Sequence, residues 1–181
     1  MSNVSKLIVQ ALGISFYNGN ISDACELAKK GGLITAPSGP GLAQDLTRCA
    51  EYRRALELSD LVLADSGLLC LWKKWVDKKP LSRISGLVFL QGILKTMDWE
   101  KKDTFWVMPD EGQAEANRGW ISKTFGSSLP NASIYIAPQY KKTGGISDPS
   151  LLAQIEESRP NSIFIQVGGG VQERLGLFLK E

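Results

Sequence analysis

The segment LVLADSGLLCLWKKW, residues 61–75, places a carboxylate where a carboxylate is costly. Leu61 to Ala64 form an apolar run fit for a buried strand, and Asp65 ends it before a helical pattern begins. An ionised carboxylate held against a hydrophobic interior is strongly disfavoured unless it is paired or used. Two roles would justify it: Asp65 caps the helix that follows, or it accepts a proton in a reaction. The residue pattern leaves both roles open.

The chain contains no histidine, which narrows the chemistry available to it. This excludes Ser-His-Asp and Cys-His catalysis and every metal site that depends on imidazole. A general base would have to be a carboxylate, Lys, Tyr or Cys. The sequence also has no Asp-x-Asp pair, no GxxxxGK[ST] phosphate loop and no complete GxGxxG, so we expect neither a metal site nor a nucleotide cofactor.

Length and charge bound the class of protein. A chain of 181 residues predicts one domain, spanning 1–181. The net charge of +2 argues against a nucleic-acid partner that is bound through a broad basic surface. Three scattered cysteines indicate a reducing compartment, and we find neither a signal-peptide pattern nor an apolar run long enough to span a membrane. These features predict a cytoplasmic protein.

Apolar runs of strand length alternate with helical patterns along the chain. The pattern predicts strands at 7–16, 32–37, 60–65, 104–109, 133–138 and 162–167, and helices at 21–30, 41–58, 67–77, 86–97, 111–125, 149–158 and 171–180. Strands that are apolar on both faces and alternate with helices indicate a parallel sheet covered on both sides. We therefore predict an α/β fold, Rossmann-like, with a largely parallel sheet of about six strands and helices on both faces.

Small and polar residues follow the predicted strands. The strand ends read TAPSGPG (35–41), DSG (65–67), PDEGQ (109–113), APQY (137–140) and GGGVQER (168–174). In open parallel sheets, ligands bind beyond the carboxyl ends of the strands, and loops before helices offer free N–H groups to a diphosphate. These features indicate a phosphate-containing ligand at that edge.

Each feature also has a structural interpretation. The GGG at 168–170 can be a tight turn, and Arg83 can be a solvated surface residue. We expect the apolar residues of 67–77 to form the buried face of a helix, with lysines on its wet face or weakly attracted to anionic lipid; the apolar residues are Leu68, Leu69, Trp72, Trp75 and Val76, and the lysines are Lys73, Lys74, Lys78 and Lys79.

The ordered set of motifs resembles the WecG/TagA/CpsF family of bacterial glycosyltransferases. The chain carries LGISFYNGNISDACELAKKGGLITAPSGPGLAQ, YRRALELSDLVLADSG, RISG, FWVMPDEGQAEA and RPNSIFIQVGGGVQE in this order. Members of the family show an LG-x-x-F opening, a V-T-P-N turn, an A-D-L-V-x-x-D-G strand end, an R-x-x-G turn and a final P-D-x-x-x-V-G-x-G-x-P-x-Q-E segment.

The resemblance implies transfer of an N-acetylhexosamine, similar to N-acetylmannosamine, from a UDP-sugar to a lipid-diphosphate-linked sugar. It implies no cofactor beyond the UDP-sugar donor, no metal, and a peripheral position at the cytoplasmic face of the inner membrane. Asp65 falls on the general base, and Thr35, on the threonine of the V-T-P-N turn, is expected to be a second catalytic residue. The expected substrate-binding residues are Arg83, Ser38, Ser66, Gly67, Gly168, Gly170, Gln172 and Glu173. A homo-oligomer is left open.

The chain departs from the family pattern at several places. TAPSGPG is longer than V-T-P-N and offers Ser38 in place of asparagine, and Val171 stands where proline is usual. We expect the C-terminal segment of the family to be missing after Glu181. An alternative function is therefore a non-catalytic module that binds a UDP-sugar or a nucleotide, and a third is an unrelated nucleotide-cofactor enzyme with a degenerate glycine loop.

Overall fold

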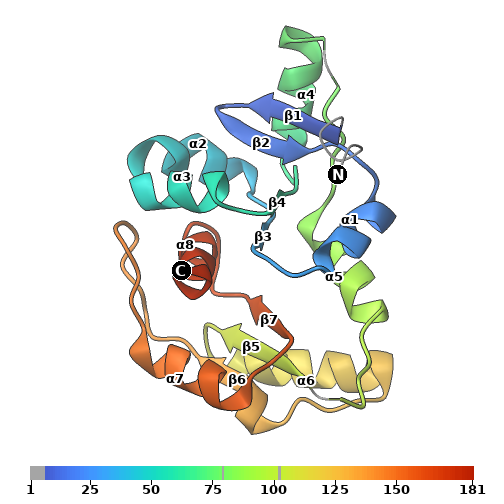
Figure 1. Ribbon diagram of the computed structural model, residues 1–181, viewed down its shortest axis with the longest axis vertical. Coiled ribbons are helices and arrows are strands. Elements are labelled where there is room, and N and C mark those ends of the chain that lie inside the picture. The colour runs from blue at the N-terminus through green and yellow to red at the C-terminus, as the bar shows by residue number, and fades with distance from the viewer. Residues whose placement is uncertain (1–6, 79, 102) are drawn as a thin grey trace.

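The computed structural model describes residues 7–78, 80–101 and 103–181 and divides into two halves, each built around a small sheet (Figure 1). The first half contains β1 (Ile8–Ala11), β2 (Ile14–Tyr17), α1 (Ile21–Ala28), β3 (Ile34–Thr35), α2 (Gly39–Arg48), α3 (Ala50–Glu57), β4 (Leu61–Val62), α4 (Gly67–Val76) and α5 (Gly86–Lys95). The second contains β5 (Thr104–Met108), α6 (Glu111–Phe125), a 3-10 turn (Asn131–Ser133), β6 (Ile134–Ile136), α7 (Pro149–Ser158), β7 (Ser162–Ile165) and α8 (Val171–Lys180).

The strands of the first half lie in the order β1-β2-β4-β3. β1 and β2 form an antiparallel hairpin, β3 and β4 pair in parallel, and a parallel bridge between Tyr17 and Leu63 joins the two pairs. One face buries Phe16 and Val62 together with residues of α2 and α3, and the other buries Leu61 and Leu63 with residues of α1 and α5. Helices therefore cover both faces of this sheet.

The second sheet is parallel throughout, in the order β6-β5-β7. All of β5 is buried, and its side chains alternate between two cores. Trp106 and Met108 pack with residues of α6, whereas Phe105 and Val107 pack with residues of α7 and α8. This two-sided burial is the reason why the strand reads as a continuous apolar run.

Helix α8 connects the halves. It follows β7, returns to the middle of the molecule and packs against α3 (Figure 1). Lys180 Nζ, near its end, lies 2.6 Å from Asp60 Oδ2 and donates a hydrogen bond to the carbonyl of Leu58 at 2.7 Å. The C-terminal end of α8 is thereby tied to the first half of the molecule.

The α/β class is confirmed, but a single sheet of about six strands is wrong for the described residues. The run at 7–16 and Tyr17 form two strands, because Leu12 and Gly13 have φ of 54° and 81° and make a tight hairpin turn. The helix expected at 41–58 is two helices, because Cys49 between them is extended. This break lets Leu46 and Tyr52 face the same core.

The expectation for residues 67–77 is also wrong in part. Of the apolar residues expected to be buried, Leu69 is buried, whereas Leu68, Trp72, Trp75 and Val76 are exposed. Lys73, expected on the wet face, is buried instead. Lys79 lies outside the described residues. The helix therefore attaches to the fold through Leu69 and Lys73, and most of its apolar residues are exposed.

Candidate functional site

Asp65 does not cap the helix that follows it. The N-cap of α4 is Ser66, whose buried Oγ accepts a hydrogen bond from the backbone N–H of Leu69 at 3.2 Å. Asp65 lies one residue earlier, just past β4, and its side chain is 25% exposed. Since Ser66 satisfies the helix terminus, the capping role that the sequence left open for Asp65 is excluded.

Arg83 fixes the position of Asp65. Its Nε donates to the backbone carbonyl of Asp65 at 2.9 Å, and its Nη2 donates to Asp65 Oδ1 at 3.3 Å. Among the described residues, none donates a hydrogen bond to the other carboxylate oxygen, Oδ2. That oxygen faces the start of α5, where a Cβ on Gly86 would lie 3.4 Å from it. One carboxylate oxygen is thus held by the arginine, and the second has no hydrogen-bond donor among the described residues.

Small residues bring the other strand ends up to Asp65. A Cβ on Gly86 would also lie 3.0 Å from the Cβ of Ala36, in the loop after β3. A Cβ on Gly39, the first residue of α2, would lie 3.2 Å from Ser66 Oγ. The loops after β3 and β4 and the start of α5 therefore meet within van der Waals distance.

The loops after β3 and β4 and the start of α5 form a rim around Asp65. The glycine turn before α8, residues 168–170, adjoins this rim. A Cβ on Gly169 would lie 3.9 Å from Ser38 Oγ, which belongs to the loop after β3. Gly168 and Gly170 have φ of +94° and +81°, a backbone conformation that other residues rarely adopt. The turn needs glycine at both positions, and through Ser38 it reaches the loops around Asp65.

Glu173 supports this turn from inside. Its side chain is 2% exposed, and its Oε2 accepts a hydrogen bond from the backbone N–H of Gly170 at 2.7 Å. Burial raises the pKa of the Glu173 carboxyl above its usual range, and the nearby Asp45 carboxylate adds to the rise, although the Gly170 hydrogen bond opposes it. The structure places Glu173 beneath the turn, away from solvent.

Arg174 binds the next loop to the same turn. It is buried, and its guanidinium donates to three backbone carbonyls: Nε to Gly170 at 2.9 Å, Nη1 to Gly144 at 2.6 Å and Nη2 to Lys141 at 2.8 Å. Arg174 therefore ties the loop between β6 and α7 to α8 through two of the loop's carbonyls, those of Gly144 and Lys141.

The remaining predicted site residues lie at or near this rim. Thr35 is buried in β3, where its hydroxyl donates to Ser59 Oγ at 3.1 Å. Gly67 begins α4, and a Cβ there would lie 3.9 Å from Cδ of Arg83. Gln172 is half-buried in the first turn of α8, with its Nε2 at 3.5 Å from Glu173 Oε1.

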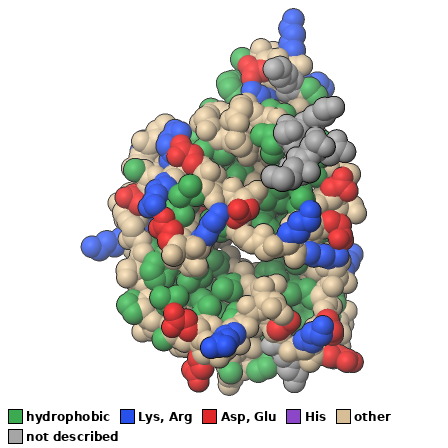
Figure 2. Space-filling model, in the orientation of Figure 1, with side chains coloured by type: hydrophobic (Ala, Val, Ile, Leu, Met, Phe, Trp, Pro, Cys, Tyr) green, Lys and Arg blue, Asp and Glu red, His purple; other side chains and the backbone are tan. Residues whose placement is uncertain are grey.

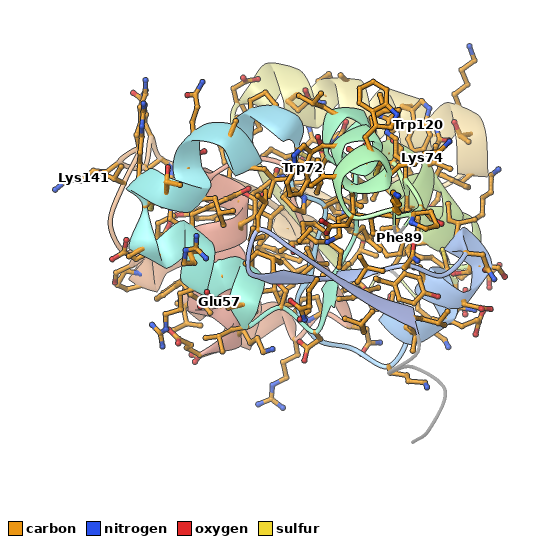
Figure 3. All side chains as sticks on the ribbon, turned by 90° about the horizontal axis from the view of Figure 1, so that it is seen from above. Glu57, Trp72, Lys74, Phe89, Trp120 and Lys141 are labelled. Carbon is orange, nitrogen blue, oxygen red and sulfur yellow. The ribbon has the colours of Figure 1, made fainter. Side chains whose placement is uncertain are left out.

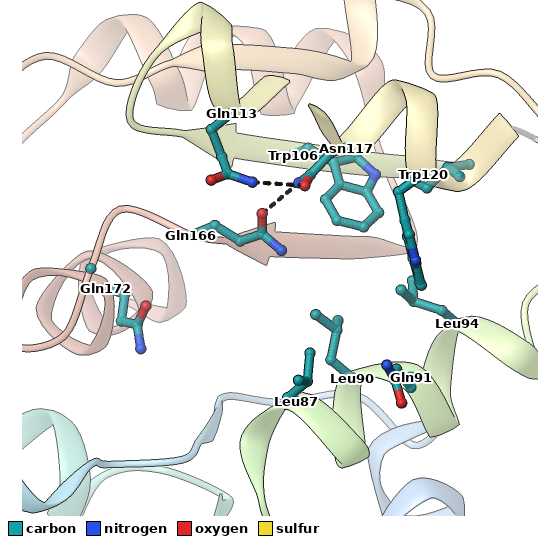
Figure 4. A pocket seen from close by; sticks show the side chains of 12 residues that line it. Leu87, Leu90, Gln91, Leu94, Trp106, Gln113, Asn117, Trp120, Gln166 and Gln172 are labelled. Atoms are coloured by element: carbon teal, nitrogen blue, oxygen red, sulfur yellow. Dashed lines mark hydrogen bonds between the residues drawn. The ribbon is translucent and has the colours of Figure 1, made fainter. Parts of the chain in front are cut away.

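A cavity of about 480 Å³ opens between the two halves, where Figure 2 shows the surface hollowed. Gly168 and Gln172 line it at one end (Figure 4). Its floor is a row of amides: Gln113 Nε2 donates to Asn117 Oδ1 at 2.9 Å, and Asn117 Nδ2 donates to Gln166 Oε1 at 2.6 Å. The rest of the wall comes from aromatic and apolar side chains, namely Leu87, Leu90, Leu94, Trp106, Trp120 and Ile121, with Gln91.

A second cavity, of about 510 Å³, lies on the other side of the start of α5. Arg83 lines it together with Asn20, Ser82 and Ser85. The predicted ligand residues are thus divided: Gly168 and Gln172 border the first cavity, and Arg83 borders the second. The first turn of α5 separates them, since Leu87 faces the first cavity and Val88 the second.

Sequence reasoning missed the amide row and two buried polar residues. Gln166 directly follows β7, and Gln113 and Asn117 are four residues apart on α6, so the rule that sites follow strand ends could have found them. Tyr52 carries a buried hydroxyl for which the described residues provide no partner, and burial raises its pKa. Neither Tyr52 nor Arg174 has a sequence signal, because their neighbours come from distant elements.

Two further observations concern the described residues as a set. No three cysteine or carboxylate side chains among them gather into a group that could hold a metal ion. None of their helices combines the length and the apolar character that crossing a bilayer requires.

Comparison with known families gives one match. The sequence model described as "Glycosyl transferase WecG/TagA/CpsF family" matches residues 4–180, nearly the whole chain. No curated protein matches the sequence. The matched range contains every strand, helix and candidate residue described above.

Proposed function

Because this chain belongs to the WecG/TagA/CpsF family of glycosyl transferases, we propose that it transfers an N-acetylhexosamine from a UDP-sugar to a lipid-diphosphate-linked sugar, with Asp65 as the general base. The observation that carries the proposal is the state of Asp65. It lies beyond a strand end, and Ser66 caps the following helix in its place. Arg83 orients its carboxylate, and one carboxylate oxygen has no donor among the described residues.

The proposed reaction forms one carbon–oxygen bond, breaks another and moves one proton. The acceptor hydroxyl oxygen attacks the anomeric carbon of the donor, and the bond from that carbon to the UDP oxygen breaks. The hydroxyl proton passes to Oδ2 of Asp65, and the electron pair leaves with UDP. A sugar hydroxyl is a weak nucleophile, so removing its proton as the bond forms accelerates the step.

Arg83 and the glycine turn would receive the departing diphosphate. Arg83 is a permanent cation, and its side chain is 58% exposed, so the guanidinium donors that do not bind Asp65 can contact a ligand. At the start of α8 the N–H groups of Gly170 and Gln172 are engaged by Glu173 and by the Gly168 carbonyl, so those of Gly169 and Val171 would be the second set of donors to an anion. Charge on the leaving group could then be stabilised without a metal ion, as we propose for this protein.

The first cavity suits the nucleoside part of the donor. The edge of a uracil ring presents both hydrogen-bond donors and acceptors, and the amides of Gln113, Asn117 and Gln166 offer both. Trp120, which is exposed, supplies flat apolar surface beside them. We place the nucleoside in this cavity and the diphosphate on the rim between Gly168 and Arg83.

Thr35 and Glu173 receive supporting roles in this proposal. The Thr35 hydroxyl is engaged with Ser59, and the Glu173 carboxylate lies beneath the glycine turn. Both side chains would shape the loops that contact the donor. The acceptor is carried by a lipid, so we propose that the protein works at the cytoplasmic face of the membrane without spanning it.

Calorimetric titration with UDP tests the donor site. UDP and UDP-N-acetylhexosamines should bind equally well with a chelator and with added manganese or magnesium, whereas NAD should not bind. Arg83→Ala should weaken UDP binding by about 1.5 to 3 kcal/mol, the usual value of a hydrogen bond to a charged group. Arg48→Ala, at an exposed arginine on α2, is the matched control and should leave UDP affinity unchanged.

Two results would contradict the proposal. Binding that disappears in the chelator and returns with the metal would rule out the metal-free donor site. Equal UDP affinity of the Arg83→Ala and Arg48→Ala variants would remove Arg83 from the site. Tight UDP binding with no sugar transfer would favour the non-catalytic alternative.

A further inference from the structure

Helix α4 presents its widest apolar face to solvent. Leu68, Leu71, Trp72, Trp75 and Val76 follow the spacing i, i+3, i+4, i+7, i+8, which places them on one stripe of an α-helix. All five are exposed, with Leu68 at 78% and Trp75 at 74%. A stripe of this width normally faces a protein core, so its exposure calls for a partner.

The helix is held to the fold from its other side. Leu69 is buried in the core with residues of α2, and Cys70 packs against the same core. The stem of Lys73 is buried, and its ammonium pairs with Asp77. The stripe can therefore be fully exposed without loosening α4.

The charges beside the stripe are positive. Lys74 and Lys78 are exposed, and Asp77, the one acidic residue of segment 67–78, is neutralised by Lys73. Figure 3, which looks down on this end of the molecule, shows Trp72 and Lys74 on α4. Tryptophan and leucine beside lysines are the residues that bind at the boundary between lipid headgroups and acyl chains.

The stripe also occupies an end of the molecule. In Figure 1, α4 projects at the top, away from the second half, and Figure 2 shows hydrophobic and basic side chains on that projection. A helix that projects from one end of the molecule can enter the headgroup region of a bilayer without a clash from the rest of the fold. Ten residues are too few to cross a bilayer, so α4 would lie in the interface.

A second copy of the chain is the other occupant to weigh. A twofold contact along the stripe would set the lysines of two copies near one another, and like charges oppose such a pairing. An anionic lipid surface meets the same lysines with the opposite charge. The charge pattern therefore favours the membrane.

We propose that α4 is the membrane-docking surface of this protein: its stripe inserts among the headgroups and acyl-chain boundary of an anionic bilayer, while Lys74 and Lys78 contact acidic headgroups. The inference deepens the proposed function, because α4 starts two residues after Asp65. At 1.5 Å per residue, the ten-residue helix spans about 15 Å, so docking would bring Asp65 close to the headgroup of a lipid-linked acceptor.

Vesicle flotation tests the inference without any sugar transfer. The wild-type chain should float with vesicles of phosphatidylglycerol and phosphatidylethanolamine in equal parts, and bind phosphatidylcholine vesicles much more weakly. The variant Leu68→Gln/Trp75→Gln/Val76→Gln should lose at least about 30-fold in vesicle affinity, because three inserted apolar side chains are removed. Since all three are exposed, its thermal unfolding should match that of the wild type.

A charge variant and a matched control complete the experiment. Lys74→Gln/Lys78→Gln should lose about 30-fold on the anionic vesicles and little on phosphatidylcholine. Leu58→Gln/Leu152→Gln removes exposed leucines far from α4 and should bind like the wild type.

Three outcomes would overturn the inference. The first is a wild-type chain that does not float with vesicles, and the second is a triple variant that floats as well as the control. The third is a wild-type chain that forms a dimer and binds no vesicles, while the triple variant is a monomer. The last result would make the stripe an interface between copies. UDP titration of the triple variant separates this inference from the proposed function, because loss of vesicle binding with unchanged UDP affinity leaves the donor site intact.

Discussion

At the scale of single residues, the main finding is the division of labour between Asp65 and Ser66. Sequence reasoning recognised that Asp65 must either cap a helix or do chemistry, but it could not choose. Both residues are good N-caps, and the choice depends on where the first helical turn begins. The structure begins α4 at Gly67, so the hydroxyl of Ser66 caps the helix and the carboxylate of Asp65 is directed to Arg83.

Glu173 is predicted from a motif to bind substrate, and the structure shows which side of the turn its carboxyl occupies. It was expected to contact substrate, whereas its carboxylate lies buried under the glycine turn. Motif matching identifies a side chain but not the side of the turn on which it lies. Because the pKa of this buried carboxyl is raised, the stability of the folded protein should depend on pH.

The folded protein should lose stability as pH rises past the usual pKa of a glutamate and through the raised pKa of Glu173. Burial, the largest cause of the shift, favours the protonated form in the folded state, so the stabilisation is complete only below the unfolded pKa. Glu173→Gln removes this titration and keeps an acceptor for the Gly170 N–H. Urea unfolding across that window should show the variant gaining free energy of unfolding relative to the wild type as pH rises. A difference that is constant with pH, or that falls, would contradict the buried carboxyl.

At the scale of elements, several helices were predictable to the residue. Those at 111–125, 149–158 and 171–180 are confirmed, because each begins after a strong N-terminal signal. Asp110 and Asp148 cap the first two through their carboxylates, and Gly170 with Glu173 begins the third. Local chemistry decides such boundaries, so the sequence contains them.

Other elements depend on tertiary contacts and could not be predicted. The break at Cys49 follows no proline or glycine, and the hairpin turn puts Leu12 at a positive φ that leucine rarely adopts. The stripe of α4 has the periodicity of a buried face, and only its neighbours reveal that nothing among the described residues covers it. Hydrophobic spacing predicts that a helix has an apolar face, and it does not say what that face contacts.

The loop between β6 and α7 yields a prediction at this scale. Arg174→Met keeps the length and the apolar stem but removes three hydrogen bonds to the carbonyls of Gly170, Gly144 and Lys141. One buried and two part-buried acceptors would lose their donor, so we expect a loss of about 2 to 4 kcal/mol in the free energy of unfolding. Urea unfolding measures it, and hydrogen exchange should rise in residues 139–147.

Arg48→Ala again serves as the control, because that arginine is exposed on α2 and should change stability by less than about 0.5 kcal/mol. An Arg174→Met variant as stable as this control, with unchanged exchange in the loop, would show that Arg174 does not hold the loop.

At the scale of the whole molecule, the sites lie where the two halves meet. The first cavity takes its walls from α5 of one half and from β5, α6 and Gln166, the residue after β7, of the other, and the glycine turn before α8 closes one end. The sequence predicted that the strand ends converge, because the rule for parallel sheets is general. It could not predict that two separate sheets meet there, because the lengths and spacing of the strand candidates are the same for one sheet as for two.

This arrangement gives each proposed task its own part of the molecule. The amide-lined cavity would hold the nucleoside, the rim from Gly168 to Arg83 the diphosphate, and α4 the membrane. Asp65 lies where these parts adjoin, three residues past the end of β4 and two residues before α4. The central claim of the account is therefore that the Asp65 carboxylate removes a proton from the acceptor.

The most direct test of that claim is the transfer rate of the Asp65→Asn variant. The assay follows a labelled N-acetylhexosamine from its UDP-sugar to a lipid-diphosphate-linked sugar in anionic vesicles. An amide cannot take up the proton, so the rate should fall by about 10²- to 10⁴-fold. UDP affinity and the free energy of unfolding should stay close to the wild type, because Ser66 keeps the cap and the Arg83 pair is partly exposed. Asp103→Asn, at the start of β5, is the control and should transfer at the wild-type rate. Transfer by Asp65→Asn at the rate of this control would contradict the account.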